Sequence, residues 1–322
     1  MTSALPVSVT PGAGESIESW LEQLADANGL TTAQLLNATG RGRASTRYLT
    51  LAPSPQTITR LAALARVDEH DVHAATLAAF DGTALNLTGL DPVDRHSYRQ
   101  VAARGWAPAH GTQICPMCLA EDRAWQGVWR LLIVTSCIGH ESLLVARCPS
   151  CRRPFRDQRH SHLRRVGASL VCGNPLGAGP TTQCPHDLTA TPTTPASDDV
   201  LTLQTRVDTA LSGQEVTVLG QAAKPGTYLS DLRHLTTLLL HLAGQPGATQ
   251  LAPWVDDLAD EADARSRDRG WTTSPTKPTP AAVIVDRAGA YAHPSPPLCE
   301  PKRWRWRTAY SPPLTSTRLP PG

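Results

Sequence analysis

The residues best suited to chemistry in this chain are cysteines that recur in pairs, two residues apart. Cys115 and Cys118 form a CxxC motif, and Cys137 and His140 form a CxxH motif with the same gap. Two intervening residues make a tight turn, or knuckle, which directs both side chains toward one point and lets backbone N–H groups donate hydrogen bonds to the thiolates. These four residues therefore form one candidate metal site with three thiolates and one imidazole.

A second set of four thiols follows along the chain. Cys148 and Cys151 form another CxxC motif, and Cys172 and Cys184 supply two further thiols. Seven of the eight cysteines and one histidine thus divide into two tetrahedral sets with no ligand left over. Zinc is the natural occupant because it is redox-inert and accepts four nitrogen or sulfur ligands, whereas an iron–sulfur cluster rarely includes histidine. We therefore expect two structural Zn²⁺ ions.

The spacing leaves alternatives open for these cysteines. The CxxC motifs that begin at Cys115 and Cys148 could share one four-thiolate site, and His186 could replace Cys184 as a ligand. A disulfide, a redox-active CxxC or a single zinc site are further interpretations of the same residues. Cys299 lies far along the chain and is expected to be a bystander thiol.

A closed site with four protein ligands stabilises a fold but activates no water, because it has no open coordination position. Zinc deaminases need an HxE motif ahead of PCxxC, and the sequence has no such HxE. The sequence also lacks the GxSxG, HExxH and GxxxxGK[ST] motifs. We therefore expect a protein that is not an enzyme, with no catalytic residues.

Two helix–turn–helix pairs are predicted ahead of the cysteines. Apolar residues in the range 17–24 recur at helical spacing, and Thr31 with Gln34 matches a capping box at the start of the next helix. Ser54 and Asp68 are typical N-caps for the second pair. Such pairs occur both in DNA-reading helix-turn-helix proteins and as plain packing units.

Arginines with few nearby carboxylates provide candidate DNA contacts. Around the second CxxC motif the carboxylates are Glu141 and Asp157, against Arg147, Arg152, Arg153, Arg156, Arg159, Arg164 and Arg165. A basic loop also separates the two helix pairs. Arginines in such places can neutralise phosphates, although a solvated basic surface is the alternative. The candidate DNA-binding residues are Arg41, Arg43, Arg47, Arg152, Arg153 and Arg156.

Length and composition indicate several modules. The chain has 322 residues, and its 28 prolines and 23 glycines predict many turns and linkers. The expected organisation is a flexible N-terminus at 1–14, a helical, helix-turn-helix-like region at 15–90, a double zinc-finger region at 91–192, a helical C-terminal region at 193–262 and a disordered Pro/Arg-rich tail at 263–322. No signal peptide or membrane-spanning run is visible in the sequence, so we expect a cytoplasmic protein.

Two apolar patterns predict further elements. Residues 130–136 are apolar and β-like, which indicates a short strand before Cys137. In the C-terminal region four leucines share one helix face, and we predict that this face belongs to the core: Leu232, Leu235, Leu239 and Leu242.

The order of these motifs resembles the TniQ family. The matching stretches are GESIESWLEQLADANGL near the N-terminus, then ICPMCLAED, WRLLIVTSCIGHESLL and RCPSCRRPF, within about residues 12–190. The resemblance implies an N-terminal helix-turn-helix region, zinc-finger motifs and a non-catalytic role in choosing the target site for DNA transposition. It also implies binding to DNA or a guide complex and recruitment of an AAA+ ATPase, which engages the transposase. The motif positions are Cys115, Cys118, Cys137, His140, Cys148 and Cys151, while Cys172 and Cys184 match less closely.

We therefore expect a mainly α protein with a small β-containing double zinc-finger module and N-terminal helix-turn-helix-like helices. The expected function is that of a DNA-binding adaptor in transposition. Its expected partners are DNA, the AAA+ ATPase and the transposase, with a second copy of the chain as a further candidate and no membrane. The alternative is a zinc-containing transcriptional regulator or protein-interaction module built from the same parts.

Overall fold

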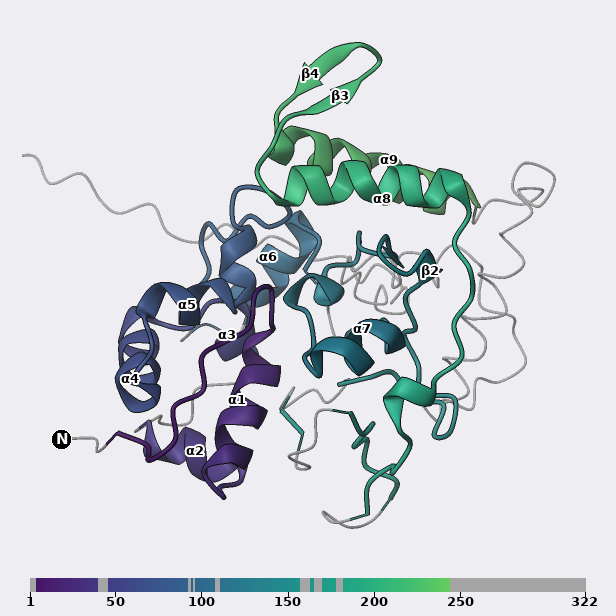
Figure 1. Ribbon diagram of the computed structural model, residues 1–322. Helices are drawn as coiled ribbons and strands as arrows, with labels where there is room; N and C mark the ends of the chain where they lie inside the picture. Colours follow the sequence, from purple (N-terminus) through teal and green to yellow (C-terminus); the bar gives the residue numbers. More distant parts are fainter. Residues whose placement is uncertain are drawn as a thin grey trace, which may run out of the picture. The chain divides into compact units, whose positions relative to one another are not determined.

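The computed structural model describes residues 4–39, 46–91, 94, 96–107, 111–156, 163–164, 170–177 and 182–243, which all belong to one compact unit. Most of the regular structure in these residues is helical, with two small antiparallel sheets of two strands each (Figure 1). The expected tail at 263–322 and Cys299 lie outside the described residues. No helix in the described part of the chain is both long enough and apolar enough to cross a bilayer.

Three of the N-terminal helices, α2, α4 and α5, begin where the sequence predicts helix caps. The Ser16 side chain caps α1, Thr31 and Gln34 form the predicted capping box of α2, and Ser54 and Asp68 cap α4 and α5. A short helix, α3, was not predicted because six residues give too little periodicity. The helices are α1 (Ile17–Ala27), α2 (Thr32–Ala38), α3 (Thr46–Leu51), α4 (Pro55–Ala65) and α5 (Glu69–Ala74).

Helix α1 is the central element of the first hydrophobic core. Ile17, Trp20, Leu21 and Leu24 are completely buried, and they pack with residues from α2, α4 and α5. Two glutamates of the same helix, Glu18 and Glu22, are also buried. Because a buried carboxylate is costly without a partner, α1 must meet compensating groups elsewhere in the fold.

The middle of the chain is built from short elements. They are the 3-10 helix η1 (Leu77–Phe80), α6 (Ser97–Arg104), α7 (Pro116–Asp122), the 3-10 helix η2 (Gly127–Arg130), β1 (Ser136–Cys137), β2 (Ser142–Leu143) and the 3-10 helix η3 (Leu188–Ala190). In the antiparallel pair, Ser136 lies opposite Leu143 and Cys137 opposite Ser142. The strand predicted at 130–136 is therefore wrong except at its last residue. Its apolar residues instead enter the core through a 3-10 turn and irregular backbone, where Leu131 and Val134 are buried.

Main-chain hydrogen bonds join the start of α1 to the segment after α7. The Ser16 N–H donates to the Trp125 carbonyl at 2.7 Å, and the Gly127 N–H donates to the Gly14 carbonyl at 2.8 Å. The Trp125 N–H in turn donates to the Ser19 hydroxyl at 3.1 Å. The N-terminal helices are thus attached to the cysteine-bearing part by backbone contacts as well as by side chains.

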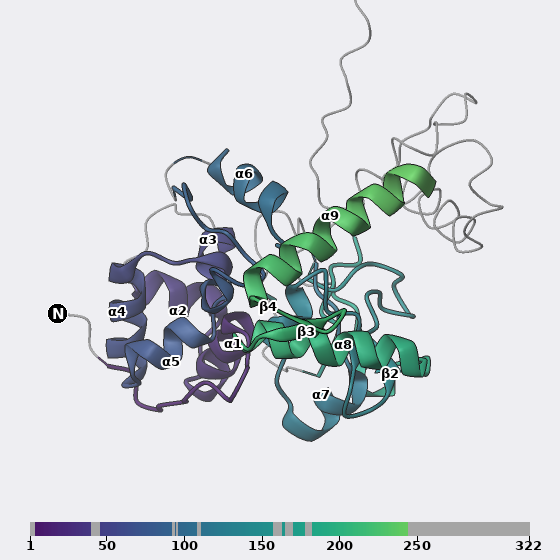
Figure 2. The same ribbon diagram turned by 90° about the horizontal axis from the view of Figure 1, so that it is seen from above.

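The last described elements are two helices joined by a hairpin. They are α8 (Asp198–Leu211), β3 (Val216–Val218), β4 (Gln221–Ala223) and α9 (Pro225–Ala243). The hairpin turns at Leu219 and Gly220, which both have positive φ, as a two-residue turn of this kind requires. Seen from above, the axes of α8 and α9 diverge from the end nearest this hairpin (Figure 2).

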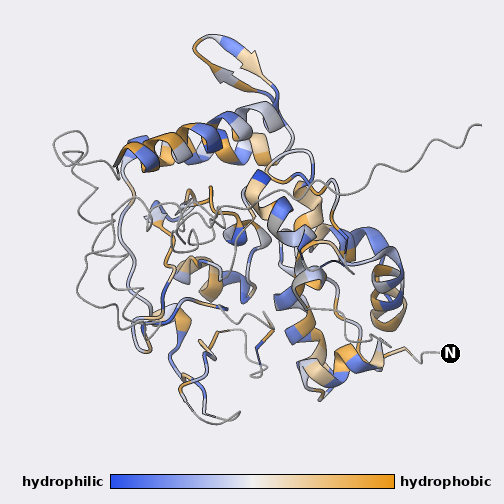
Figure 3. Cartoon of the chain, turned by 180° about the vertical axis from the view of Figure 1, so that it is seen from behind, coloured by the Kyte–Doolittle hydropathy of each residue, from blue (hydrophilic) through white to orange (hydrophobic). Residues whose placement is uncertain are grey.

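The start of α9 is anchored in the second hydrophobic core, and its end is not. Leu229 is completely buried, and its carbonyl accepts a hydrogen bond from the Trp106 indole at 2.8 Å. Leu232 is partly buried against the same core, whereas Leu235, Leu239 and Leu242 are about half exposed. The prediction that these last three leucines are core residues is therefore wrong, because α9 leaves the core beyond its second turn. The hydropathy view shows apolar stretches along α8 and α9 (Figure 3).

Candidate metal centres and the ion network beside them

The first candidate metal centre consists of Cys115, Cys118, Cys137 and His140. Cys115 is the N-cap residue of α7, and Cys118 lies within that helix, whose first position is a proline. Cys137 ends β1, and His140 follows in the turn toward β2. The His140 Nδ1 atom lies 3.5, 3.3 and 3.4 Å from the three sulfurs in chain order, and the Cys118 and Cys137 sulfurs are 3.5 Å apart.

The second centre consists of Cys148, Cys151, Cys172 and Cys184. The Cys148 and Cys184 sulfurs are 3.8 Å apart, and those of Cys151 and Cys172 are 3.9 Å apart. Backbone hydrogen bonds align the two later cysteines: the Cys184 N–H donates to the Asn174 carbonyl at 2.8 Å, and the Gly173 N–H donates to the Cys184 carbonyl at 3.1 Å. Cys172 and Cys184 are too far apart in the sequence to be joined by one tight turn. The pairing of the extended segments around them brings their side chains together instead.

Both groups fit a tetrahedral metal ion. Usual Zn–S and Zn–N bond lengths place two sulfurs about 3.8 Å apart and a sulfur and a nitrogen about 3.6 Å apart. The observed separations of 3.3 to 3.9 Å lie close to these values. A disulfide would need sulfurs about 2.05 Å apart, and the seven described cysteines are all free. Each of the two groups can hold one metal ion.

The grouping of ligands is the one that the sequence predicts. The alternative in which the two CxxC motifs share a site is not what the fold produces, because Cys115 and Cys148 belong to different groups. His186 does not replace Cys184 either. Its Nε2 atom pairs with the Thr191 hydroxyl at 3.1 Å, and its carbonyl accepts a hydrogen bond from the Cys172 N–H.

Polar groups around the ligands orient them and tune their acidity. His140 Nε2 lies 3.1 Å from a carboxylate oxygen of Glu121, and this hydrogen bond raises the pKa of His140. Hydrogen bonds from Cys118 and then from Cys137 lower the pKa of the Cys115 thiol well below its usual range. Burial opposes ionisation of Cys151, but hydrogen bonds from the Arg153 N–H and the Asn174 side chain outweigh it and lower its pKa.

Four protein ligands per centre also limit the chemistry. A tetrahedral ion held in this way has no open position for water or substrate. The arrangement is suited to stabilising loops, and less to activating a nucleophile.

Of the predicted DNA-binding arginines, two are exposed, one is buried, and the side chains of the other three lie outside the described residues. Arg152 and Arg153 are exposed beside the second centre, and Arg153 donates a hydrogen bond to the Pro175 carbonyl. Arg147 donates to the Arg152 carbonyl at 3.0 Å. Arg41, Arg43 and the side chain of Arg47 lie outside the described residues.

Arg156 has to be removed from the set of expected phosphate contacts. It is 4% exposed, and its guanidinium donates to both carboxylate oxygens of Glu22, at 2.8 and 3.0 Å. A guanidinium already held in this bidentate geometry inside the fold cannot also reach a DNA backbone. The prediction for Arg156 is wrong because a local excess of positive charge does not reveal a carboxylate that is distant in the sequence.

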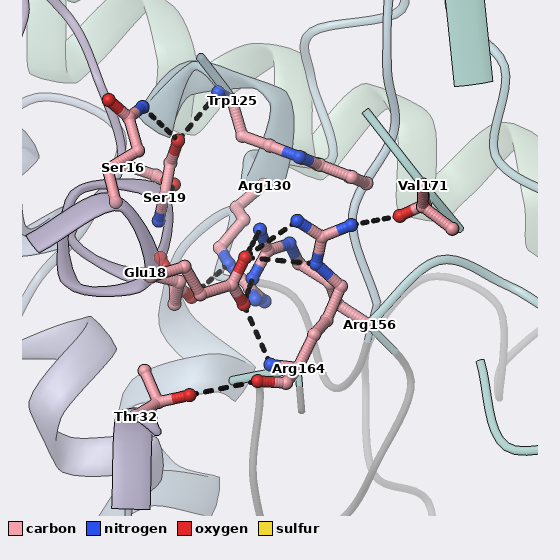
Figure 4. Close-up of polar contacts among 11 residues, drawn as sticks. Ser16, Glu18, Ser19, Thr32, Trp125, Arg130, Arg156, Arg164 and Val171 are labelled. Atoms are coloured by element: carbon pink, nitrogen blue, oxygen red, sulfur yellow. Dashed lines mark hydrogen bonds and ion pairs between the residues drawn. The ribbon is translucent and has the colours of Figure 1, made fainter. Parts of the chain in front are cut away.

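Glu22 is the centre of a buried ion network, and Figure 4 shows its two arginine partners, Arg156 and Arg164. Besides Arg156, it accepts hydrogen bonds from the Arg164 side chain at 3.0 and 2.7 Å and from the Arg164 backbone N–H at 2.7 Å. Burial alone would raise the pKa of Glu22, but Arg156 and Arg164 lower it, so the carboxylate stays ionised. The guanidinium carbons of Arg156 and Arg164 lie 4.3 and 5.1 Å from the centre of the Trp125 ring.

A second buried ion pair lies one helical turn earlier on α1. Arg130 Nε is 2.6 Å from Glu18 Oε1, and both side chains are 2% exposed. The Arg130 guanidinium also donates to the Gly111 carbonyl at 3.1 Å. Sequence reasoning missed both ion pairs, although one signal was available. Glu18 and Glu22 stand four residues apart among the apolar positions of α1, where uncompensated carboxylates are not expected.

The fold and the two centres define a mainly helical protein whose irregular middle can be held by two metal ions. Residues 6–144 match the TniQ family model, so this stretch is a TniQ domain, as the order of its motifs predicts. The match contains the first centre and ends before Cys148. No curated protein is significantly similar to the chain.

Proposed function

We propose that this protein is a non-catalytic adaptor in DNA transposition, which binds DNA at the target site and brings an AAA+ ATPase and the transposase to it. The observation that carries the proposal is the TniQ domain at residues 6–144, since this domain is associated with transposition. The closed ligand sets agree with a protein that positions other molecules and leaves the strand chemistry to a partner.

Zinc is the proposed metal in both centres. Zinc is a borderline soft ion, so it suits both ligand sets: three thiolates with one imidazole, and four thiolates. The separations between the ligand atoms also match its preference for tetrahedral coordination. Elemental analysis of the purified protein should return about two zinc ions per chain. Material that is folded and contains no zinc would overturn this part of the proposal.

Arg152 and Arg153 are the proposed phosphate contacts among the described arginines. Both are exposed, and the surrounding backbone is fixed by the Cys148 and Cys151 knuckle. Arg147 and Arg153 each donate a hydrogen bond to a backbone carbonyl group. Because these side chains are already ordered in the free protein, binding of DNA would cost less conformational entropy. A fixed basic surface of this kind recognises the DNA backbone and leaves base sequence to other contacts.

DNA binding can be tested by fluorescence anisotropy on a labelled duplex over a series of salt concentrations. Replacing Arg152 and Arg153 by alanine should reduce the slope of log affinity against log salt by about 1.8, since each lost phosphate contact contributes about 0.9. The matched control replaces Arg66 and Arg206, which are also exposed and carry the same charge. Arg66 shares the left-handed backbone of Arg152, with φ of 57° against 59°. An unchanged slope in the variant that lacks Arg152 and Arg153 would show that these arginines do not contact phosphates.

The adaptor role itself is tested by capture of partners. The full chain, used as bait in its native host, should retain an AAA+ ATPase and a transposase. The Arg152 and Arg153 variant should retain both proteins as well, because those arginines are proposed to contact DNA. Retention of RNA polymerase subunits, with no ATPase or transposase, would favour a transcriptional regulator.

A further inference from the structure

The segment between the two ligand pairs of the four-thiolate centre carries both arginines that bind Glu22. Arg156 follows Cys151 by five positions, and Arg164 precedes Cys172 by eight. The chain between the two ligand pairs therefore contacts the buried carboxylate of α1 at two described residues, Arg156 and Arg164. Whatever fixes Cys151 and Cys172 in space also limits where these two guanidinium groups can lie.

Arg164 connects the centre to two helices at once. Its side chain donates to Glu22 of α1 and to the carbonyl of Val171, which immediately precedes the ligand Cys172. Its own carbonyl accepts a hydrogen bond from the Thr32 hydroxyl, at the first position of α2, at 2.9 Å. A shift of the extended segment around Cys172 would thus be transmitted directly to both α1 and α2.

The described part of this segment is held by backbone hydrogen bonds and has few fully buried apolar side chains. Between Cys151 and Cys172, Phe155 is the only hydrophobic side chain among the described residues that is fully buried, Leu163 and Leu170 are partly buried, and Glu22 compensates charge of the two buried arginines. Loops with few apolar contacts open at low free-energy cost unless a cross-link holds them. A metal ion that joins Cys148, Cys151, Cys172 and Cys184 would be that cross-link.

The segment between Cys118 and Cys137, which joins the ligand pairs of the first centre, has more buried apolar side chains. It also contacts α1, through Arg130 and Glu18. However, it contributes Leu119, Trp125, Leu131 and Val134 to the hydrophobic core, and hydrogen bonds of its main chain join it to α1. Its position therefore depends on packing as well as on metal ligation.

We propose that metal binding at the four-thiolate centre controls the docking of α1, and that Arg156 and Arg164 transmit the effect through Glu22. Loss of this ion frees the two arginines from their fixed positions, so α1 and the helices packed on it detach more often. Loss of the ion from the other centre leaves α1 docked. The inference requires only that both centres hold metal, and it does not depend on the proposed role in transposition.

Thermodynamic linkage gives the inference a reciprocal form. If the ion favours the docked state of α1, then docking of α1 must favour the ion by the same factor. A variant that weakens docking without touching a ligand should therefore release metal more easily from the four-thiolate centre, and only from that centre.

Hydrogen exchange of the full chain, measured together with metal content, tests the direct effect. Cys172→Ser should lose one metal ion per chain and raise amide exchange in α1 by about tenfold or more, whereas Cys137→Ser should lose one ion and change it by less than about twofold. Equal acceleration of α1 in both variants, or none in Cys172→Ser, would overturn the proposal.

Glu22→Gln tests the reciprocal effect and avoids any ligand change that could prevent folding. It should keep both ions at saturating zinc, accelerate exchange in α1, and release one of its two ions to a chromogenic chelator about tenfold faster than the unmodified chain. Asp26→Asn, an exposed carboxylate on the same helix, is the matched control and should change neither rate. Unchanged release from Glu22→Gln would refute the coupling even if the protein were destabilised.

Discussion

Replacing Glu22 by glutamine removes one charge from a buried ion network. Glu22 is 1% exposed and accepts hydrogen bonds from both guanidinium groups and from the Arg164 backbone. Removing one partner of a buried ion network costs about 3–5 kcal/mol, because the remaining charges stay buried without compensation. Glutamine retains one acceptor oxygen, so we expect the lower end, about 3 kcal/mol. For an ordered unit of this size the melting temperature should fall by about 6–12 °C.

The assay is thermal and urea unfolding of the full chain at saturating zinc, followed by circular dichroism. Asp26→Asn should stay within about 0.5 kcal/mol of the unmodified protein, since its carboxylate is exposed on the same helix. A double-mutant cycle with Arg164→Gln should give a coupling energy of about 1–3 kcal/mol. A loss below about 1 kcal/mol for Glu22→Gln, or a coupling near zero, would refute the view that this network holds α1 in place.

Three further predictions concern the metal centres and the packing of α9. Glu121→Ala should weaken zinc binding at the first centre by about 10–100-fold in competition with a chelator, because the carboxylate orients the histidine ligand, whereas Asp122→Ala should not. Gly226→Ala should destabilise the fold by about 1–3 kcal/mol in urea, because a Cβ would lie 2.5 Å from a backbone carbonyl oxygen, whereas Gly177→Ala has open space and should be neutral. Lowering the pH from 7 should release zinc between about pH 6 and 4, as protons compete for the thiolates and the imidazole. The pKa of Glu22 is lowered, so its stabilising contribution is fully present above its unfolded pKa near 4.5 and is lost only at still lower pH. We therefore expect zinc to be released before the contribution of Glu22 is lost. Zinc release that begins only below the unfolded pKa of Glu22 would contradict this prediction.

The ligand sets could be predicted from the sequence because a knuckle is a local structure. Two residues between ligands fix the direction of both side chains, whatever the rest of the fold does. The caps of α1, α2, α4 and α5 are local in the same sense, since each depends on side chains two or three residues from the helix start. The choice of Cys184 over His186 was not local, because it depends on how the extended segments around Cys172 and Cys184 pair.

The buried arginines could not be predicted from their neighbourhood. Arg156 and Arg164 stand 134 and 142 residues after Glu22, and nothing within that interval marks the three as partners. Seen locally, they belong to a run of arginines that would suit a DNA backbone as well as Arg152 and Arg153 do. The prediction that the α9 leucines are buried was wrong for a related reason. Helical spacing predicts which residues share a face, but that face is buried only where another element covers it.

The ion network also bears on where the functional unit ends. The match to the TniQ family stops at residue 144, yet Glu22 lies inside the matched stretch and both of its arginine partners lie beyond it. Residues 6–144 alone would bury a carboxylate without a counter-charge, at a cost of about 3–5 kcal/mol, where the net stability of an ordinary domain is about 5–15 kcal/mol. The chain between Cys151 and Cys172 carries those two arginines, so the first helix of the TniQ domain packs against charges that lie outside the matched residues.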